Sequence, residues 1–185
     1  MLAYVVSDAE FRTKRFRSLE SALLEFLSEK GCSVERRSIE RGELKSCAGC
    51  FGCWVKTPGE CIVRDPIAEI NRRSMQSDVT IYLCPIVFGQ FSANMKNVID
   101  RWLPNMLPFF LTRPDGSTMH PPRYDSYPAQ VMIGYGDDLQ AEDEALFCDI
   151  TKKHRNGIEA MVWHNAEELG RTLGDMRFER IGGSL

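Results

Sequence analysis

Residues 79–101 read VTIYLCPIVFGQFSANMKNVIDR, and this stretch decides the fold class. It opens with a nearly continuous apolar run over residues 79–84, the pattern of a central strand buried on both faces of a parallel sheet. Ser92 follows at a position where its side chain can cap the start of a helix. The apolar face of that helix recurs at i, i+3, i+4 and i+7, which predicts packing against the sheet. This face consists of Met95, Val98, Ile99 and Trp102.

The sequence before this unit shows the same alternation of strand and helix. Residues 2–6 form a short apolar run, and an apolar stripe at helical spacing follows and ends before Gly31, which can form a left-handed cap. Residues 33–39 predict a weaker strand at or near the sheet edge, because arginines interrupt it. Asp65 and Pro66 open a short helix that runs to about residue 75. The stripe before Gly31 consists of Leu19, Leu23, Phe26 and Leu27.

The sequence after this unit begins with a long excursion. Residues 104–128 carry six of the nine prolines, and loops of this length tend to cover active sites or subunit contacts. A strand over residues 131–133 then leads to a helix from about 139 to 154, and a last strand over 158–163 precedes a final helix and a polar tail. Five strands separated by helices predict an α/β fold with a doubly wound parallel sheet, in which ligands bind beyond the carboxyl ends of the strands.

Length and composition limit the classes of function. With 185 residues, 43% hydrophobic and 26% charged, the chain is expected to form one domain over residues 1–185. A formal net charge of −3 gives no reason to expect nucleic acid as a partner. No apolar run reaches the roughly 18 to 20 residues that cross a bilayer, and no leader pattern is present, so we expect a cytoplasmic protein without a membrane partner.

The strongest chemical signal is a loop rich in cysteine. The chain has seven cysteines, an odd number that cannot all pair, and four of them fall within residues 47–61. In a reducing compartment such crowding indicates metal or redox chemistry rather than disulfides. Two-residue spacers let thiolates converge on one centre, and the glycines between them relieve crowding. The four candidate ligands are Cys47, Cys50, Cys53 and Cys61.

The sequence leaves three states of this loop open. Four thiolates suit either tetrahedral Zn²⁺ or a [4Fe–4S] cluster. The compact run of three cysteines favours iron, because structural zinc sites more often use two separated pairs of ligands. A loop of reduced thiols that holds no metal is the third state. Cys32 and Cys84 lie beside or within apolar strands and are expected to be small core residues.

Several of these segments together resemble the flavodoxin-like NAD(P)H-dependent FMN reductases, and especially the iron–sulfur flavoproteins among them. The matching stretches are residues 47–65 with their cysteine spacing, residues 85–92, and the Met95-Lys96-Asn97 and Ile99-Asp100-Arg101 runs of the following helix. The resemblance implies a flavodoxin-like three-layer α/β/α sandwich with a five-stranded parallel sheet in the order 2-1-3-4-5. It also implies FMN as cofactor, NAD(P)H as electron donor, and a homodimer or homotetramer.

The resemblance also implies where the flavin ring lies. The loop after the third strand would meet the ring, with backbone amides available to its N5 and O4 edge, and the turn after the fourth strand would approach from the other side. For Tyr135 an alternative stays open, in which the ring only closes the turn. The first segment consists of Pro85, Ile86, Val87, Phe88, Gly89 and Gln90, and the second of Gly134, Tyr135, Gly136 and Asp137.

One segment departs from the family pattern. The first loop of the family has small and hydroxyl residues that cradle the FMN phosphate at a helix start, whereas residues 7–18 here have no glycine and include Asp8 and Glu10. Side-chain charge and hydroxyls could hold the phosphate instead. A solvated charged face is the alternative. The candidate phosphate ligands are Ser7, Arg12, Thr13, Arg15, Arg17 and Ser18.

These features predict an FMN-dependent oxidoreductase or electron-transfer flavoprotein that exchanges electrons with a small molecule or a protein. The flavin would carry the chemistry, so no catalytic side chain is assigned. The three histidines show no metal or triad spacing. A second hypothesis is a non-enzymatic protein that has kept the fold, lost FMN, and acts as a metal-binding or protein-interaction module.

Overall fold

A computed structural model describes residues 1–154, 158–176 and 178–182. Over these residues the centre of the fold is a sheet of five parallel strands in the order β2-β1-β3-β8-β9. This order confirms the predicted flavodoxin-like α/β fold with the strand sequence 2-1-3-4-5, and it places the weak second strand at the edge. The strands are β1 (Leu2–Asp8), β2 (Ser33–Ile39), β3 (Val79–Val87), β8 (Ala129–Tyr135) and β9 (Ile158–Val162).

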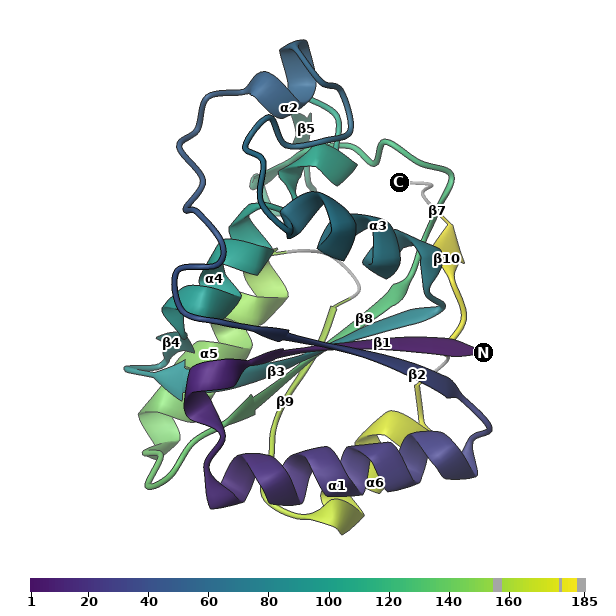
Figure 1. Cartoon of the computed structure of the whole chain (residues 1–185), viewed down its shortest axis with the longest axis vertical. Helices are drawn as coiled ribbons and strands as arrows, with labels where there is room; N and C mark the ends of the chain where they lie inside the picture. Colours follow the sequence, from purple (N-terminus) through teal and green to yellow (C-terminus); the bar gives the residue numbers. More distant parts are fainter. Residues whose placement is uncertain (155–157, 177, 183–185) are drawn as a thin grey trace.

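Two layers of helices cover the sheet (Figure 1). Alternate residues of a strand point to opposite faces, so Ala3 and Val5 join the core beneath one helix layer while Tyr4 and Val6 join the core beneath the other. None of the helices in the described residues is long and apolar enough to cross a membrane. One layer holds α1 (Lys14–Glu29) and α6 (Ala166–Gly174), and the other holds α3 (Ile67–Gln76), α4 (Ala93–Asp100) and α5 (Ala141–His154).

The first helix shows how local sequence sets an element. The Thr13 side chain accepts a hydrogen bond from the amide of Phe16 and so caps the amino end of α1. Gly31, just beyond the carboxyl end, has φ = +68°, a conformation that favours glycine. Three members of the predicted stripe, Leu19, Leu23 and Leu27, are fully buried together with Phe16, whereas Phe26 is half-buried.

The third strand is longer than predicted. We expected it to end at Cys84, but β3 continues through Pro85 to Val87 and folds back on β4 (Gln90–Phe91), which runs antiparallel to it. The two residues between the strands, Phe88 and Gly89, both have positive φ, as a two-residue hairpin turn with the right twist requires. Residues 85–91 are therefore a hairpin rather than an open loop.

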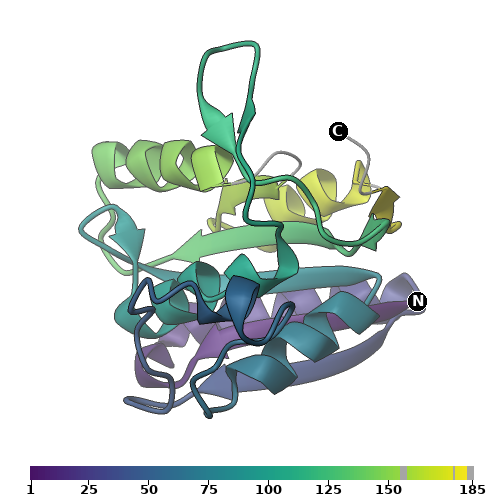
Figure 2. The ribbon, with the colours of Figure 1, turned by 90° about the horizontal axis from the view of Figure 1, so that it is seen from above.

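The proline-rich excursion contains only short elements, among them η2 (Leu103–Asn105) and the antiparallel pair β5 (Leu111–Thr112) and β6 (Thr118–Met119). We call residues 107–122 the arm, because they project from the body of the molecule (Figure 2). The excursion ends in β7 (Ser126–Tyr127), which pairs with β10 (Ile181–Gly182). The last residues of the predicted polar tail lie outside the described residues. The remaining short helices are η1 (Ala9–Phe11) and α2 (Gly52–Val55).

Gly134 lies where β8 has no space for a side chain. An added Cβ would come within 2.7 Å of Ile86 Cδ1 and 2.8 Å of Phe147 Cε1. We expect Gly134→Ala to lower the free energy of unfolding by about 1–3 kcal/mol, the usual cost of overpacking a core. Urea denaturation measures this difference.

Gly170→Ala is the matched control, because a Cβ at this position inside α6 meets no atom within 4 Å. It should raise stability by about 0.4–1 kcal/mol, since alanine restricts the unfolded chain. A Gly134→Ala protein as stable as this control would contradict the close packing of β8.

Candidate functional site

The carboxyl edge of the sheet brings the predicted flavin segments together. Ser7 at the end of β1 pairs in register with Leu83 of β3, and Pro85 of β3 pairs with Tyr135 of β8. The first loop, the hairpin over residues 85–91 and the turn after β8 therefore start from three adjacent strands. This is the edge at which open parallel sheets bind ligands.

The hairpin presents both a buried base and an exposed tip. Pro85 and Ile86 are buried, and Gly89 is buried where a Cβ would meet the side chain of Leu146 at 2.7 Å. Phe88, in contrast, is 92% exposed and stands at the tip. Val87 is half-buried and Gln90 is exposed beside it. An exposed aromatic ring on a rigid two-residue turn is a surface on which a flat ring can stack.

On the neighbouring strand, Tyr135 packs into the core. Its side chain is 1% exposed, its ring lies 5.5 Å from that of Phe16, and its hydroxyl donates to the carbonyl of Phe11 at 3.1 Å. Burial, followed by the nearby Cys84 and Asp8, raises the pKa of this hydroxyl. These contacts favour the alternative in which Tyr135 closes the turn. The next residues, Gly136 and Asp137, are half-buried and exposed respectively.

Asp8 is a buried carboxylate that the sequence placed beside the predicted phosphate. It is fully buried, and it accepts hydrogen bonds from Ser92 Oγ at 2.5 Å and from Asn94 Nδ2 at 2.9 Å. It also accepts from the backbone amide of Glu10. Asp8 thus faces the start of α4, where a helix dipole favours an anion. Three neutral donors therefore stabilise this carboxylate inside the protein.

The candidate phosphate ligands cluster at the start of α1, but they divide into groups. Arg12 donates to Ser38 Oγ at 2.9 Å and lies over the ring of Phe16, and Ser7 also reaches Ser38. Arg15 reaches the carbonyl of Trp163 at the far side of the edge. The other side chains bond within the segment: Thr13 caps the helix, Arg17 donates to the Arg12 carbonyl, and Ser18 donates to the Lys14 carbonyl.

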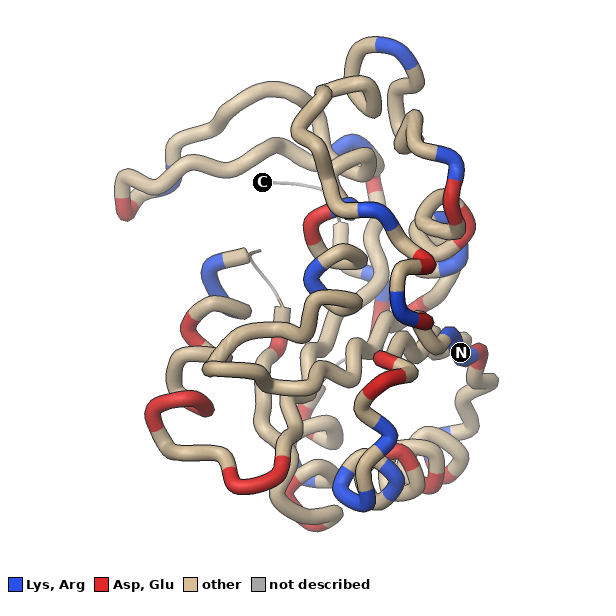
Figure 3. Tube along the Cα trace, turned by 60° about the vertical axis from the view of Figure 1, so that its left-hand side comes forward, with Lys and Arg blue, Asp and Glu red and all other residues tan. Residues whose placement is uncertain are grey.

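The chemistry of this segment fits an anion. Four Lys and Arg positions lie close together in the chain at the amino end of α1, where the backbone trace is coloured blue in Figure 3. The first amides of a helix lack partners within it. Exposed Arg12, Lys14 and Arg17 lie beside those amides. The carboxyl edge therefore offers an aromatic tip for a ring and a cationic helix start for a phosphate.

The cysteine loop supplies a suitable set of donors, but not a formed metal site. All seven cysteines lie in the described part of the chain and are free thiols. Burial first, and then the charges of Cys61, Cys47 and Cys50, raise the pKa of the Cys53 thiol. Across the described ranges, no three His, Cys, Asp or Glu side chains are arranged to hold a metal ion. The donors fit a thiolate centre, and ligation would require the loop to close further.

Two anchors hold this loop. On α2, Trp54 Nε1 donates to the carbonyls of Leu103 and Met106, and its ring contacts Phe51 and His120. This anchor joins the loop to the excursion.

The second anchor is a buried ion pair between Arg101 and Asp65, whose side chains are 2% and 8% exposed. Burial raises the pKa of the Asp65 carboxyl, but hydrogen bonds from Arg101 and from the amides of Lys45 and Ile67 outweigh it, so the pKa is lowered. Sequence reasoning assigned no chemistry to Asp100-Arg101. Helical spacing was the missed signal, because Arg101 lies three residues after Val98 and on the same buried face.

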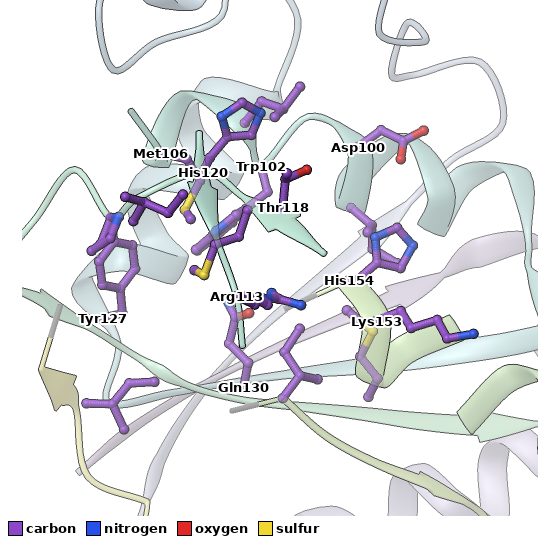
Figure 4. A pocket seen from close by; sticks show the side chains of 18 of the residues that line it. Asp100, Trp102, Met106, Arg113, Thr118, His120, Tyr127, Gln130, Lys153 and His154 are labelled. Atoms are coloured by element: carbon purple, nitrogen blue, oxygen red, sulfur yellow. The ribbon is translucent and has the colours of Figure 1, made fainter. Parts of the chain in front are cut away.

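A separate hollow of about 930 Å³ is lined by residues of both the sheet and the excursion. Tyr82 and Met132 from the sheet line it together with residues of the arm, and Cys47 and Gly49 reach its rim. Asp100, Lys153 and His154 lie on one side of it, and Met106 and Tyr127 on the other (Figure 4). None of the predicted flavin residues lines this hollow.

Comparisons with known proteins show the family to which this chain is related. The family model described as NADPH-dependent FMN reductase matches residues 12–110. An iron-sulfur flavoprotein from Archaeoglobus fulgidus is 38% identical over 88 residues, which are 48% of this chain and 39% of that protein. An iron-sulfur flavoprotein from Methanocaldococcus jannaschii is 32% identical over 96 residues, which are 52% of this chain and 49% of that protein. The chain therefore aligns with less than half the length of either relative.

Solved structures share the fold over nearly the whole chain. The NAD(P)H:quinone oxidoreductase from Methanothermobacter marburgensis has a TM-score of 0.67 and 14% identity, and the match covers 96% of this chain and 98% of that one. An azoreductase from Bacillus anthracis has a TM-score of 0.60 and 14% identity, with 93% and 94% covered. At such identity these matches describe the fold alone.

Replacing Asp65 by asparagine tests the buried ion pair. We expect Asp65→Asn to cost about 3–5 kcal/mol of unfolding free energy near neutral pH, because it leaves Arg101 buried without its carboxylate. The folded-state pKa of Asp65 is lowered, so its contribution is present above the unfolded pKa of about 4 and disappears as the pH falls through the folded value. Denaturant unfolding of both proteins across this pH range measures the difference.

Asp115→Asn serves as the control for this change. Hydrogen bonds from the side chain and amide of Ser117 lower the pKa of the Asp115 carboxyl, but that group is exposed at the tip of the arm. Its replacement should change global stability little. Equal effects of the two substitutions at neutral pH would mean that the Arg101 pair does not stabilise the fold.

Proposed function

The chain belongs to the NADPH-dependent FMN reductase family, and on this basis we propose that it is an FMN-dependent oxidoreductase with its flavin at the carboxyl edge of the sheet. The observation that carries the proposal is the meeting of three segments at that edge: the cationic start of α1, the hairpin over residues 85–91, and the turn after β8. The family match over residues 12–110 includes the first two of these.

The ring would rest on the hairpin and the phosphate at the start of α1. Bound FMN would supply the redox chemistry, accepting a hydride from NAD(P)H and delivering electrons to an acceptor. The chain would contribute the amides of residues 88–90, the exposed Phe88 ring, and the Arg12 and Lys14 charges. Buried Asp8 would hold the hairpin and first loop in fixed positions through Ser92, which directly follows β4. The residues that bind the flavin need no acid or base of their own.

For the cysteine loop we propose a [4Fe–4S] cluster. Two curated relatives of the chain are named iron-sulfur flavoproteins, and the four cysteines between residues 47 and 61 are all free thiols. Such a cluster would exchange single electrons with the flavin and with a small-molecule or protein acceptor. Zinc and a metal-free loop are the other outcomes of iron and sulfide analysis on protein purified without oxygen.

We also propose that two copies associate through the arm. Phe109 and Phe110 on the arm are 64% and 71% exposed, and Phe51 and Val55 on the cysteine loop are exposed as well. The ring of His120 contacts both Phe110 and Trp54, so the arm and the loop form one aromatic surface. Exposed apolar area of this kind on a projecting hairpin is typical of a protein–protein contact.

Titration of the protein with FMN tests the main proposal. We expect flavin fluorescence to be quenched with saturable binding, and bound flavin to be reduced anaerobically by NADPH or NADH. Gly89→Val should weaken FMN binding at least tenfold, because valine is strained at φ = +69° and its Cβ would approach Leu146.

Gly116→Val is the matched control. It imposes the same kind of strain at φ = +81° on the tip of the arm, where no atom lies within 4 Å of an added Cβ, and it should bind FMN as the unaltered chain does. An unaltered chain that binds no FMN would sink the enzyme proposal and favour the non-enzymatic module. Equal FMN affinity of the two variants would mean that the flavin does not bind at the hairpin.

The arm contact is tested by light scattering coupled to size-exclusion chromatography. We expect the unaltered chain to dimerise and the Phe109→Ser, Phe110→Ser double variant to raise the dimer Kd at least tenfold, about 1.4 kcal/mol. Leu146→Ser, which removes an exposed apolar side chain from α5 instead, should dimerise normally. Unchanged dimerisation of the double variant would exclude the arm as the contact.

A further inference from the structure

Arg101 is a buried cation at the carboxyl end of α4, and the fold gives it an unusual set of partners. Only 2% of its side chain is exposed, and burying a charge is costly unless it is paired and hydrogen-bonded. The carbonyl of the same residue accepts from Asn71 Nδ2 at 2.9 Å. This hydrogen bond fixes the backbone of Arg101, and the partners described next fix its side chain.

The two arms of the guanidinium reach both ends of the cysteine loop. Nη1 donates to the Asp65 carboxylate and, at 3.0 Å, to the carbonyl of Lys45. Nη2 lies 3.1 Å from Cys61 Sγ and 3.5 Å from the carbonyl of Val63. Lys45 precedes the first cysteine of the loop, and the other partners are the last cysteine, Cys61, and two residues just after it, Val63 and Asp65. One side chain therefore joins the two ends of the loop.

Asp65 completes this closure. Its Oδ2 also accepts from the amide of Lys45 at 2.9 Å, and its Oδ1 accepts from the amide of Ile67 at 3.2 Å. The carboxylate therefore links Lys45, which precedes the loop, to the start of α3. Because Asp65 engages only one arm of the guanidinium, the other arm is left to face the sulfur.

A charged N–H donor forms a strong hydrogen bond to an anionic acceptor, and cysteine binds a metal as the thiolate. Groups that hold metal ligands in place and make them better donors typically change metal affinity by about 10–100-fold. A lysine would keep the charge but not the planar fork, which is what lets arginine bind several acceptors at once. Arg101 thus combines a geometric role with an electrostatic one.

We infer that Arg101 is a positioning residue for the thiolate centre, closing the cysteine loop and holding Cys61 toward its metal. This inference rests on the metal-binding part of the proposed function. It also fixes the centre relative to the flavin edge, because α4 starts at Ala93, beside the Asp8 anchor, and its eight residues span about 12 Å.

Cobalt titration of the reduced, metal-free chain tests this inference, since thiolate-to-cobalt absorption reports ligation directly. We expect Arg101→Met to weaken Co²⁺ binding by about 10–100-fold and Arg101→Lys to weaken it by an intermediate factor. Arg123→Met is the matched control, because Arg123 donates to the carbonyls of Pro104 and Met106 and should leave cobalt affinity unchanged.

Hydrogen exchange of the metal-free chain provides a second readout that does not need a metal. In Arg101→Met the amides of Lys45 and Ile67 should exchange at least tenfold faster than in the unaltered chain, while Arg123→Met leaves them protected. Wild-type cobalt affinity in Arg101→Met, or an equal loss in Arg123→Met, would overturn the inference. If Arg101→Met does not fold, Arg101→Lys decides, and wild-type affinity and protection in that variant would overturn the inference as well.

The two proposals fail in different ways. If the unaltered chain binds neither cobalt nor, after reconstitution with iron and sulfide, a cluster, then the metal-binding function is wrong. The exchange measurement still decides whether Arg101 closes the loop, because unchanged protection of Lys45 and Ile67 in its variants would refute that role by itself.

Discussion

The buried carboxylate of Asp8 is the constraint on which the candidate site depends. It joins the end of β1 to Ser92 and Asn94 at the start of α4, residues that lie more than eighty positions away in sequence. With both oxygens bonded, the carboxylate fixes the start of the first loop against the residue that follows the hairpin over residues 85–91. The pairing of β1 with β3 holds the two strands in register, and the Asp8 carboxylate extends this link to the segments beyond the strand ends.

The same helix carries an opposite charge at its other end. A helix dipole favours an anion at its amino end and a cation at its carboxyl end, and α4 has buried Asp8 at the first and buried Arg101 at the second. Each charged side chain also contacts a segment with a proposed binding role. Asp8 contacts the first loop, and Arg101 contacts the cysteine loop. A short helix with both ends fixed in this way sets the separation between the two.

How much of this the sequence could predict depends on whether the signal is local. The alternation of strands and helices followed from apolar runs and helical spacing, as in residues 79–101, whereas the order of the strands followed from the family resemblance. The hairpin did not, because Pro85 suggested the end of a strand and positive φ at Phe88 is uncommon for a residue other than glycine. Asp8 was placed beside the phosphate because it is close in sequence, whereas its partners are distant. The hollow beside the arm could not be predicted, because the residues of the irregular excursion that line it follow no periodic sequence pattern.

The cysteine loop shows why motif and geometry answer different questions. The spacing of Cys47, Cys50 and Cys53 allows their thiolates to meet, but spacing says nothing about what opposes the repulsion of several anions brought together. In the fold the Arg101 cation can offset this repulsion, because Asp65 holds it in place and its guanidinium donates to Cys61. The sequence analysis gave Arg101 no chemical role. The loop is anchored at its ends and less constrained at Cys47 and Cys50, both of which are exposed. Closure around a metal would then require movement of the exposed cysteines toward the anchored one, and the anchored end sets where the centre forms.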